Sequence, residues 1–239
     1  MSTTFEPITM LPLVLLPAMP CDARLYRAQL EGLSDIVDPE VKILAQESFA
    51  ASAELLLSQV NGRFIVAGTA YGGCLAMEVL ARAPDRVAGL WLMNCNPGMH
   101  PDPAGVRVIS ARIRNGEQAA VTQEFAERAI PPADTLSRAM FVQMARDCGA
   151  ALFARQSDAA LTRRDHWGTL ALVEVPTLLI WGAADTFVPI EVGRRIAGIL
   201  PDARYEVLPG CGHFPSMERP EATTAIAREW LLDRFRGRN

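Results

Sequence analysis

A short glycine-flanked turn, between a predicted strand and a predicted helix, is the segment of this sequence best suited to chemistry. It reads Phe64-Ile-Val-Ala-Gly-Thr-Ala-Tyr-Gly-Gly-Cys74. Its glycines let the backbone turn sharply and let the helix pack close to the strand, as a nucleophile elbow of the form G-x-S-x-G requires. The central residue of such a turn stands above the sheet, beside the positive helix N-terminus. Here that residue is Ala70, which carries no nucleophilic atom.

The other reactive residue types are scarce in the 239 residues, and their scarcity excludes several kinds of site. Only three histidines occur, His100, His166 and His213, and none of them stand at a zinc-binding spacing. Lys42 is the single lysine, so a G-K-[ST] phosphate-binding loop is absent. With a net charge of −4, a basic nucleic-acid face is not expected either. We therefore expect no metal, no cofactor and no nucleic-acid partner.

Cysteine usage and the N-terminus bear on where the protein works. The five cysteines are odd in number and contain no C-x-x-C pair, which favours reduced thiols in a cytoplasmic protein. The first ten residues hold no Lys or Arg before an apolar run, and no run of 18 apolar residues follows. We expect neither a signal peptide nor a membrane span.

Short apolar runs alternate with longer amphipathic ones along most of the chain, a pattern that predicts parallel βαβ units. The runs are mostly continuous rather than alternating, as expected for a sheet covered by helices on both faces. Predicted strands span 13–16, 41–45, 64–67, 87–93, 177–181 and 204–208, and predicted helices span 22–33, 49–60, 72–83, 190–200 and 220–235.

One stretch, from Pro97 to about Leu170, breaks this alternation with helix-like segments at 117–129 and 136–153. It holds nine of the 22 arginines against eight acids. Because strand patterns return on both flanks, we interpret 97–170 as a helical cap inserted into a core of 1–96 and 171–239. The alternative is an ordinary helical connection with no role over a site.

Three motifs in chain order make the sequence similar to the α/β-hydrolase superfamily, from about Leu11 to the C-terminus. The glycine-flanked turn resembles the family's elbow, Leu178-Leu-Ile-Trp-Gly-Ala-Ala-Asp-Thr-Phe-Val-Pro189 resembles its acid segment, and Gly210-Cys-Gly-His-Phe214 its histidine segment. The resemblance implies an α/β fold: a three-layer α-β-α sandwich with a mostly parallel sheet and an inserted helical cap. Few residues precede the first predicted strand, so the leading antiparallel strands common in the family are expected to be shortened or partly missing.

The resemblance also implies a set of site residues. Ala70 occupies the nucleophile position, Asp185 the acid position and His213 the base position. His213 is also the only histidine at the end of a predicted core strand. The oxyanion-hole amides map to Tyr71 and Met19, although Pro17 and Ala18 replace the usual His-Gly before Met19.

Alanine at the elbow leaves three explanations open. The favoured one is an engineered Ser-to-Ala variant of an active hydrolase, because the acid and base are intact. The second is a natural, non-catalytic relative that binds a ligand. The third is a reaction that needs only a histidine base and an oxyanion hole, such as that of a lyase or a cofactor-free oxygenase.

The substrate is less well specified than the reaction. Carboxylic ester or lactone hydrolysis through an acyl-enzyme is favoured, with carbon-carbon bond hydrolysis of a diketone as the alternative; an aspartate nucleophile is not indicated. Bulky residues bordering the motifs are expected to line the substrate site: Met19, Tyr71, Trp167, Val188 and Phe214. The cap arginines could recognise a substrate carboxylate or an acidic carrier protein, but a solvated helix face is the favoured interpretation. A small ester or lactone is thus the expected partner, with no role for a membrane and no indication of oligomeric state.

Overall fold

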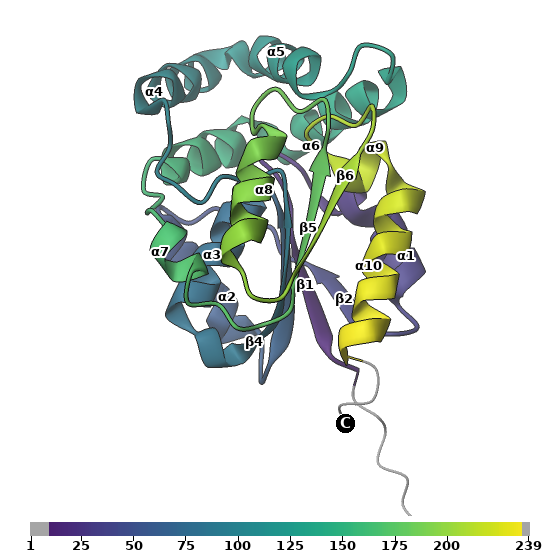
Figure 1. Ribbon diagram of the computed structural model, residues 1–239. Coiled ribbons are helices and arrows are strands. Elements are labelled where there is room, and N and C mark those ends of the chain that lie inside the picture. Colours follow the sequence, from purple (N-terminus) through teal and green to yellow (C-terminus); the bar gives the residue numbers. More distant parts are fainter. Residues whose placement is uncertain (1–9, 236–239) are drawn as a thin grey trace, which may run out of the picture.

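The computed structural model describes residues 10–235 and contains one six-stranded sheet flanked by helices (Figure 1). The strand order is β2-β1-β3-β4-β5-β6, and every strand pair is parallel. The strands are β1 Pro12–Leu16, β2 Asp38–Val41, β3 Phe64–Thr69, β4 Val87–Met93, β5 Thr177–Gly182 and β6 Ala203–Leu208. The core helices are α1 Arg27–Leu33, α2 Phe49–Gln59, α3 Tyr71–Arg82, α8 Ile190–Ile199, α9 Pro215–Glu218 and α10 Pro220–Phe235.

Two hydrophobic layers hold the sheet between its helices. Alternate residues of the central strands point to opposite faces, so that Val66 and Leu92 pack toward α2 and α3, whereas Ile65 and Trp91 pack toward α1 and α10. Burial of each such side chain contributes about 1.5–3 kcal/mol. This confirms the predicted three-layer α-β-α sandwich and explains why the central strands β3, β4 and β5 are buried along their whole length and do not alternate apolar with polar residues.

The sheet departs from the sequence prediction at its first edge. The strand predicted at 41–45 is wrong: β2 runs over Asp38–Val41 and pairs only with β1. Pro39 has no N–H to donate, which an edge strand tolerates because one side of it has no partner strand. The apolar residues beyond the strand misled the prediction, since Ile43 is 42% exposed. The predicted helix 22–33 is likewise divided, into a 3-10 turn, η1 Ala23–Tyr26, and α1.

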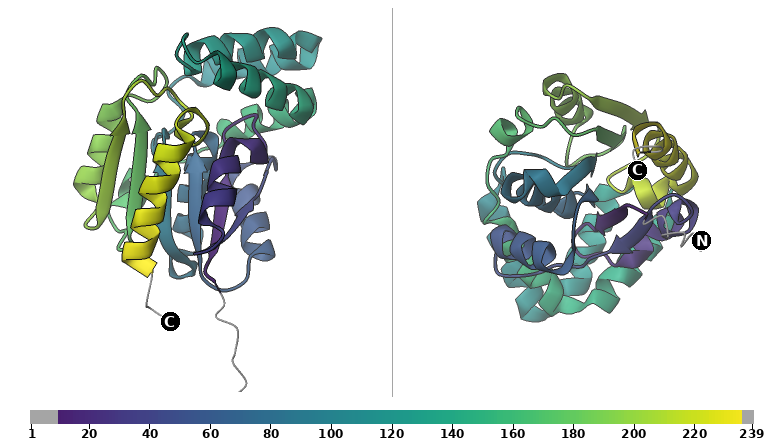
Figure 2. Two further views of the ribbon diagram at one scale, coloured as in Figure 1. Left: turned by 90° about the vertical axis from the view of Figure 1, so that its right-hand side faces the viewer. Right: turned by 90° about the horizontal axis from the view of Figure 1, so that it is seen from below.

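Four helices, α4 Pro103–Arg112, α5 Gln118–Ala129, α6 Thr135–Ala160 and α7 Trp167–Leu170, form the stretch predicted to be helical. The first three of them lie across the carboxyl ends of the strands, and α7 lies beside α3 (Figures 1 and 2). Glycines divide this stretch: Gly116, with φ 91°, separates α4 from α5, and Gly149, with φ 80°, interrupts α6. These positive φ values favour glycine over any other residue.

Within residues 10–235, no helix is both long and apolar enough to cross a bilayer. The prediction that the N-terminus carries no signal peptide falls mainly on residues 1–9, which lie outside the described part of the chain.

Candidate active site

Ala70 forms the tip of a sharp turn between β3 and α3. Its backbone has φ 51° and ψ −110°, a conformation that non-glycine residues rarely adopt and that costs on the order of 1–3 kcal/mol. Its N–H donates to the carbonyl of Met93 on β4 at 2.9 Å, and its carbonyl accepts the N–H of Cys74 at 3.0 Å. A side chain at Gly68 would overlap the backbone of Gly72, so the turn could not close with another residue there. The strained elbow geometry is therefore fully formed around a side chain that has no nucleophile.

Asp185 and His213 lie together although 28 residues separate them. Asp185 follows β5 and His213 follows β6, and these strands are neighbours in the sheet. The Nδ1 atom of His213 lies 2.8 Å from Oδ2 of Asp185. The Asp185 side chain is fully buried and that of His213 is 10% exposed. The chain thus brings together the acid and base that the sequence predicted.

The surroundings of Asp185 keep it ionised. Burial disfavours its charge, but the His213 ring, the side-chain amide of Asn94 and the N–H of Phe187 all stabilise the carboxylate, and the pKa of Asp185 is lowered from its usual value. A carboxylate only accepts hydrogen bonds, so Nδ1 of His213 carries the proton. The opposite ring nitrogen, Nε2, is then deprotonated in the neutral ring and can act as a base.

Asn94 is a site residue that the sequence analysis missed. It follows β4, is fully buried and has φ 44°. Its Nδ2 donates to Oδ2 of Asp185, and its Oδ1 accepts the N–H of Gly182 at 3.1 Å. The positive φ is one that asparagine tolerates better than most residues. Its position at the end of a buried strand, one residue after Met93, is the signal that could have identified it.

Glu218 is a second residue that was missed. It lies in α9, is 5% exposed, and accepts the N–H groups of Gly212 at 2.6 Å and Phe214 at 2.8 Å. Glu218 therefore holds the backbone on both sides of His213. Burial raises the pKa of Glu218, an effect that these two N–H groups and the nearby His213 oppose.

The two predicted oxyanion-hole residues lie on segments that meet at the elbow. As the first residue of α3, Tyr71 has a backbone N–H that its helix does not bond. A side chain at Gly72 would overlap the carbonyl of Leu16, so the loop carrying Met19 is pressed against the start of α3. Ala18 needs no glycine-like backbone, because Ala70 and Asn94 are the only non-glycine residues with positive φ among residues 10–235.

Aromatic side chains connect His213 to the helices above it. Phe214 meets the His213 ring edge-on at 5.2 Å and stacks on Phe141 of α6 at 5.1 Å. Phe187, which the sequence analysis did not single out, lies 5.0 Å from the His213 ring and stacks on Phe125 of α5 at 5.7 Å. These contacts make the surroundings of the His213 ring apolar on the side of the helical stretch.

The other residues predicted to line a substrate site take different places. Met19 packs against both the core and the small cluster around Phe153 in the helical stretch. The ring of Tyr71 packs on Phe49 inside the core at 4.7 Å, so the backbone of Tyr71, not its ring, belongs to the elbow. Val188 packs against the core, and Trp167 lies under the guanidinium of Arg195 at 3.9 Å. Within residues 10–235, no aromatic contact, hydrogen bond or ion pair joins Trp167 to Asp185 or His213.

Several arginines of the helical stretch already have partners there. Arg112 pairs with Glu117 and Glu124, and Arg114 with Asp158. Arg138 donates to the carbonyls of Glu127 and Ile130. Carboxylates therefore balance the charges of Arg112 and Arg114, and all three guanidinium groups bind within the helical stretch itself.

The hydroxyl and the thiol nearest the elbow, those of Thr69 and Cys74, are buried and hydrogen-bonded elsewhere. The hydroxyl of Thr69 is fully buried and bonded to the Tyr26 hydroxyl at 2.8 Å. The thiol of Cys74 is 2% exposed and contacts the Asn96 carbonyl at 3.4 Å. Neither replaces a serine at position 70. All five cysteines are free, and no cluster of three potential metal ligands occurs among residues 10–235.

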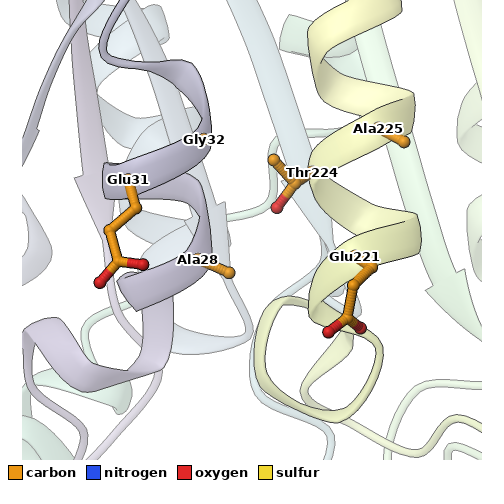
Figure 3. Close-up of a pocket in the computed structure, with 6 residues that line it drawn as sticks. All are labelled: Ala28, Glu31, Gly32, Glu221, Thr224 and Ala225. Atoms are coloured by element: carbon orange, nitrogen blue, oxygen red, sulfur yellow. The ribbon is translucent and has the colours of Figure 1, made fainter.

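A separate surface hollow lies between α1 and α10 (Figure 3). Glu31 and Glu221 stand on its facing helices, and a side chain at Gly32 would come within 2.6 Å of Thr224. Its walls carry no histidine or thiol and belong to elements other than those that bear Ala70, Asp185 and His213. We assign this hollow to helix packing.

An elbow after β3, an acid after β5 and a histidine after β6 are the arrangement of an α/β-hydrolase. The sequence profile of the Alpha/beta hydrolase family matches residues 16–226, and the chain belongs to this family.

Relatives of known activity within the family differ in what they act on. The chain is 26% identical over 212 residues to the 2-hydroxy-6-oxononadienedioate/2-hydroxy-6-oxononatrienedioate hydrolase of Cupriavidus pinatubonensis, covering 73% of this chain and 68% of that protein. It is 24% identical over 227 residues to the pimeloyl-[acyl-carrier protein] methyl ester esterase of Neisseria meningitidis serogroup B, covering 91% of this chain and 86% of the esterase.

Among solved structures, the esterase of Thermogutta terrifontis superposes with a TM-score of 0.86 at 24% identity, covering 94% of this chain and 90% of the esterase. The enol-lactonase of Burkholderia xenovorans gives 0.83 at 18% identity, covering 93% of this chain and 92% of the lactonase. The structural matches show the shared fold, and all four relatives are hydrolases by name.

Proposed function

We propose that this chain carries the active site of a serine hydrolase for small carboxylic esters or lactones, in a Ser-to-Ala form that is nearly inactive. The observation that carries the proposal is the strained elbow at Ala70 together with the buried Asp185 and His213 pair. An elbow conformation costs free energy, and a buried acid and histidine cost desolvation. The proposal rests on the two features occurring together at the carboxyl ends of β3, β5 and β6, because a buried acid and histidine alone would also suit a structural role.

The proposed chemistry follows from the donor and acceptor pattern of the site. With serine at position 70, Nε2 of His213 would take the hydroxyl proton while the oxygen attacks the carbonyl carbon of the substrate. The N–H groups of Met19 and Tyr71 would stabilise the oxyanion, and the alcohol would leave with the proton from His213. Water, activated by the same nitrogen, would then hydrolyse the acyl-enzyme. Ala70 removes the attacking oxygen and leaves the remaining parts in place.

The substrate class in this proposal is apolar and small. Phe187 and Phe214 border His213, and their stacking partners Phe125 and Phe141 come from the helices above. The ion pairs of Arg112 and Arg114 are satisfied within those helices, which argues against recognition of an acidic carrier protein by these residues. As part of the same proposal, residues 97–170 act as the cap, residues 1–96 and 171–239 as the core, and the protein works in the cytoplasm.

A second candidate activity is hydrolysis of a carbon-carbon bond in a diketone. It is favoured by the similarity to the Cupriavidus pinatubonensis hydrolase, whose name describes an oxo-dienedioate substrate. The same histidine and oxyanion-hole positions would serve both activities, so the two are separated by substrate and not by site.

The experiment is the Ala70→Ser substitution, assayed with short-chain activated esters, a simple lactone and a 1,5-diketone. We expect ester or lactone turnover to rise on the order of 10⁶-fold, because removing one triad member from a comparable enzyme has about that effect. Ala70→Gly is the matched control: it suits the positive φ, supplies no nucleophile and should stay inactive. A folded Ala70→Ser protein with no gain on any ester or lactone would refute the proposed function, and a gain confined to the diketone would establish the second candidate. If the Ala70→Ser protein binds an ester without turning it over, the chain is a non-catalytic binding protein.

A further inference from the structure

Asn94, at the end of β4, lies between the end of β3, which carries Ala70, and the end of β5, which carries Asp185. Its side chain bridges the Asp185 carboxylate and the backbone N–H of Gly182, the last residue of β5. Its neighbour Met93 accepts the N–H of Ala70 at 2.9 Å. The segment that closes β4 therefore touches both the elbow and the acid. Asn94 is fully buried, so water does not compete for these hydrogen bonds.

The orientation of the Asn94 amide is determined by its partners. The N–H of Gly182 can only donate, so the amide end that faces it must be the oxygen. The NH₂ end is then directed at Asp185, where Oδ2 accepts from both Asn94 and His213. Oδ1 of Asp185 accepts the N–H of Phe187 at 2.8 Å. Three donors surround the carboxylate and fix its plane relative to the imidazole.

We propose that Asn94 is a positioning residue, which holds the Asp185 carboxylate so that it orients His213 with the proton on Nδ1. The expected effect of Asn94 on catalysis rests on the proposed function, whereas its effect on the orientation of Asp185 and His213 does not. Asn94 touches no reacting atom. It acts through Asp185, in the same way that residues behind a metal ligand orient that ligand. The aromatic contacts of His213 do not determine which ring nitrogen carries the proton, because they form no hydrogen bond with either nitrogen.

The first experiment uses the chain as it stands. We expect proton NMR of the Ala70 protein to show a low-field Nδ1–H resonance of His213, protected by its hydrogen bond to Asp185. Asn94→Gly removes the amide while suiting the positive φ, and we expect that resonance to broaden or disappear. Asn96→Gly is the matched control, since Asn96 lies in the same loop and, within residues 10–235, its side chain forms a single hydrogen bond, accepted from the N–H of Gly98 at 2.9 Å. The control should keep the resonance.

The second experiment measures catalysis in the Ala70→Ser background. We expect Asn94→Gly to lower kcat by about 10- to 100-fold with little change in KM, as for other residues that orient a catalytic group. Asn96→Gly should leave kcat within about twofold. If Ala70→Ser is itself inactive, the proposed function fails, and the NMR experiment still decides the role of Asn94.

Asn94→Asp keeps the shape and the acceptor for Gly182, and it tests the donor alone even if Asn94→Gly does not fold. Two facing carboxyl groups share a proton, because the pKa of one is strongly raised. The shared proton mimics the Asn94 donor, so activity relative to Ala70→Ser should fall as the pH rises and that proton leaves. The other titratable groups near the pair, Cys211 beside Asp185 and Glu218 beside His213, are unchanged in this variant. An unchanged pH profile together with an unchanged resonance would overturn the inference.

Discussion

Two buried carboxylates in this molecule each bind a histidine ring, and they serve different purposes. Asp185 binds Nδ1 of His213 at 2.8 Å, and Glu78 on α3 binds Nε2 of His166 at 3.0 Å. The side chains of Asp185 and Glu78 are 0% and 1% exposed. Burial and a histidine partner are therefore shared by both pairs and cannot identify the active site.

The difference lies in what else surrounds each pair. Glu78 also binds Arg82 and Arg164, each at 2.8 Å, so two permanent cations compensate its charge. The second ring nitrogen of His166, Nδ1, lies 3.4 Å from the hydroxyl of Thr169, and the backbone N–H of His166 donates to the carbonyl of Pro97 at 2.9 Å. This network joins both ends of the helical stretch to α3. Among residues 10–235, no arginine pairs with Asp185, and no hydrogen bond involves Nε2 of His213.

The largest effect is expected when each histidine is replaced by glutamine in the Ala70→Ser background. We expect His213→Gln to lower kcat/KM by on the order of 10⁴- to 10⁶-fold, because the base is lost. His166→Gln should lower stability by about 1–3 kcal/mol through its lost hydrogen bonds while kcat/KM stays within about threefold. Ester kinetics and urea unfolding measure the two effects. Equal losses of activity would mean that the Glu78 network also belongs to the catalytic site.

A second test concerns the free energy of unfolding. Burial disfavours the Glu78 charge, but His166, Arg164 and Arg82 outweigh this effect and lower the pKa of Glu78 to about 2. A lowered pKa stabilises the fold above the ordinary carboxyl range, and this stability is lost as the pH falls toward 2. The shift corresponds to about 3 kcal/mol.

We therefore expect Glu78→Gln to lower the unfolding free energy at pH 7 by about 3 kcal/mol, with the deficit shrinking as the pH is lowered. Glu54→Gln is the matched control, because Glu54 also pairs with Arg82 but is 67% exposed. Its effect should stay below about 1 kcal/mol. Urea titrations at several pH values test both variants, and a deficit for Glu78→Gln that does not depend on pH would contradict the assignment.

Sequence reasoning reached the fold because the central strands β1, β3, β4 and β5 are almost entirely apolar runs and amphipathic segments lie between the strands. It failed at β2, where pairing with β1 and not hydrophobicity selects the strand. It placed Ala70, Asp185 and His213 because each follows a predicted strand in a recognisable motif. It missed Asn94, Phe187 and Glu218 because their roles depend on contacts across the sheet end. Such contacts, like that between Glu218 and the backbone around His213, leave no periodic pattern in one sequence.

The smallest expected effect concerns Glu218, a third buried carboxylate, which binds backbone N–H groups where Asp185 and Glu78 bind histidines. Burial raises the pKa of Glu218, although the N–H groups of Gly212 and Phe214 oppose the change. A raised carboxyl pKa acts with the opposite sign to that of Glu78: the protonated form suits the folded state, so stability is present at low pH and is lost as the pH rises above the ordinary carboxyl range.

Glu218→Gln removes this titration and one of the two backbone hydrogen bonds, since an amide has a single acceptor oxygen. We expect stability at pH 7 to change by about 1 kcal/mol or less, because a lost hydrogen bond and a relieved buried charge oppose each other. In the Ala70→Ser background, kcat should fall by less than about tenfold, because His213 keeps Asp185 but loses part of its backbone support. Urea unfolding from pH 4 to 8 and ester kinetics measure both. The opposite result would be a stability of the unsubstituted chain that rises from pH 4 to 8, with this rise lost in Glu218→Gln. The ionised Glu218 would then stabilise the loop through its charge, as Glu78 and Asp185 stabilise their surroundings.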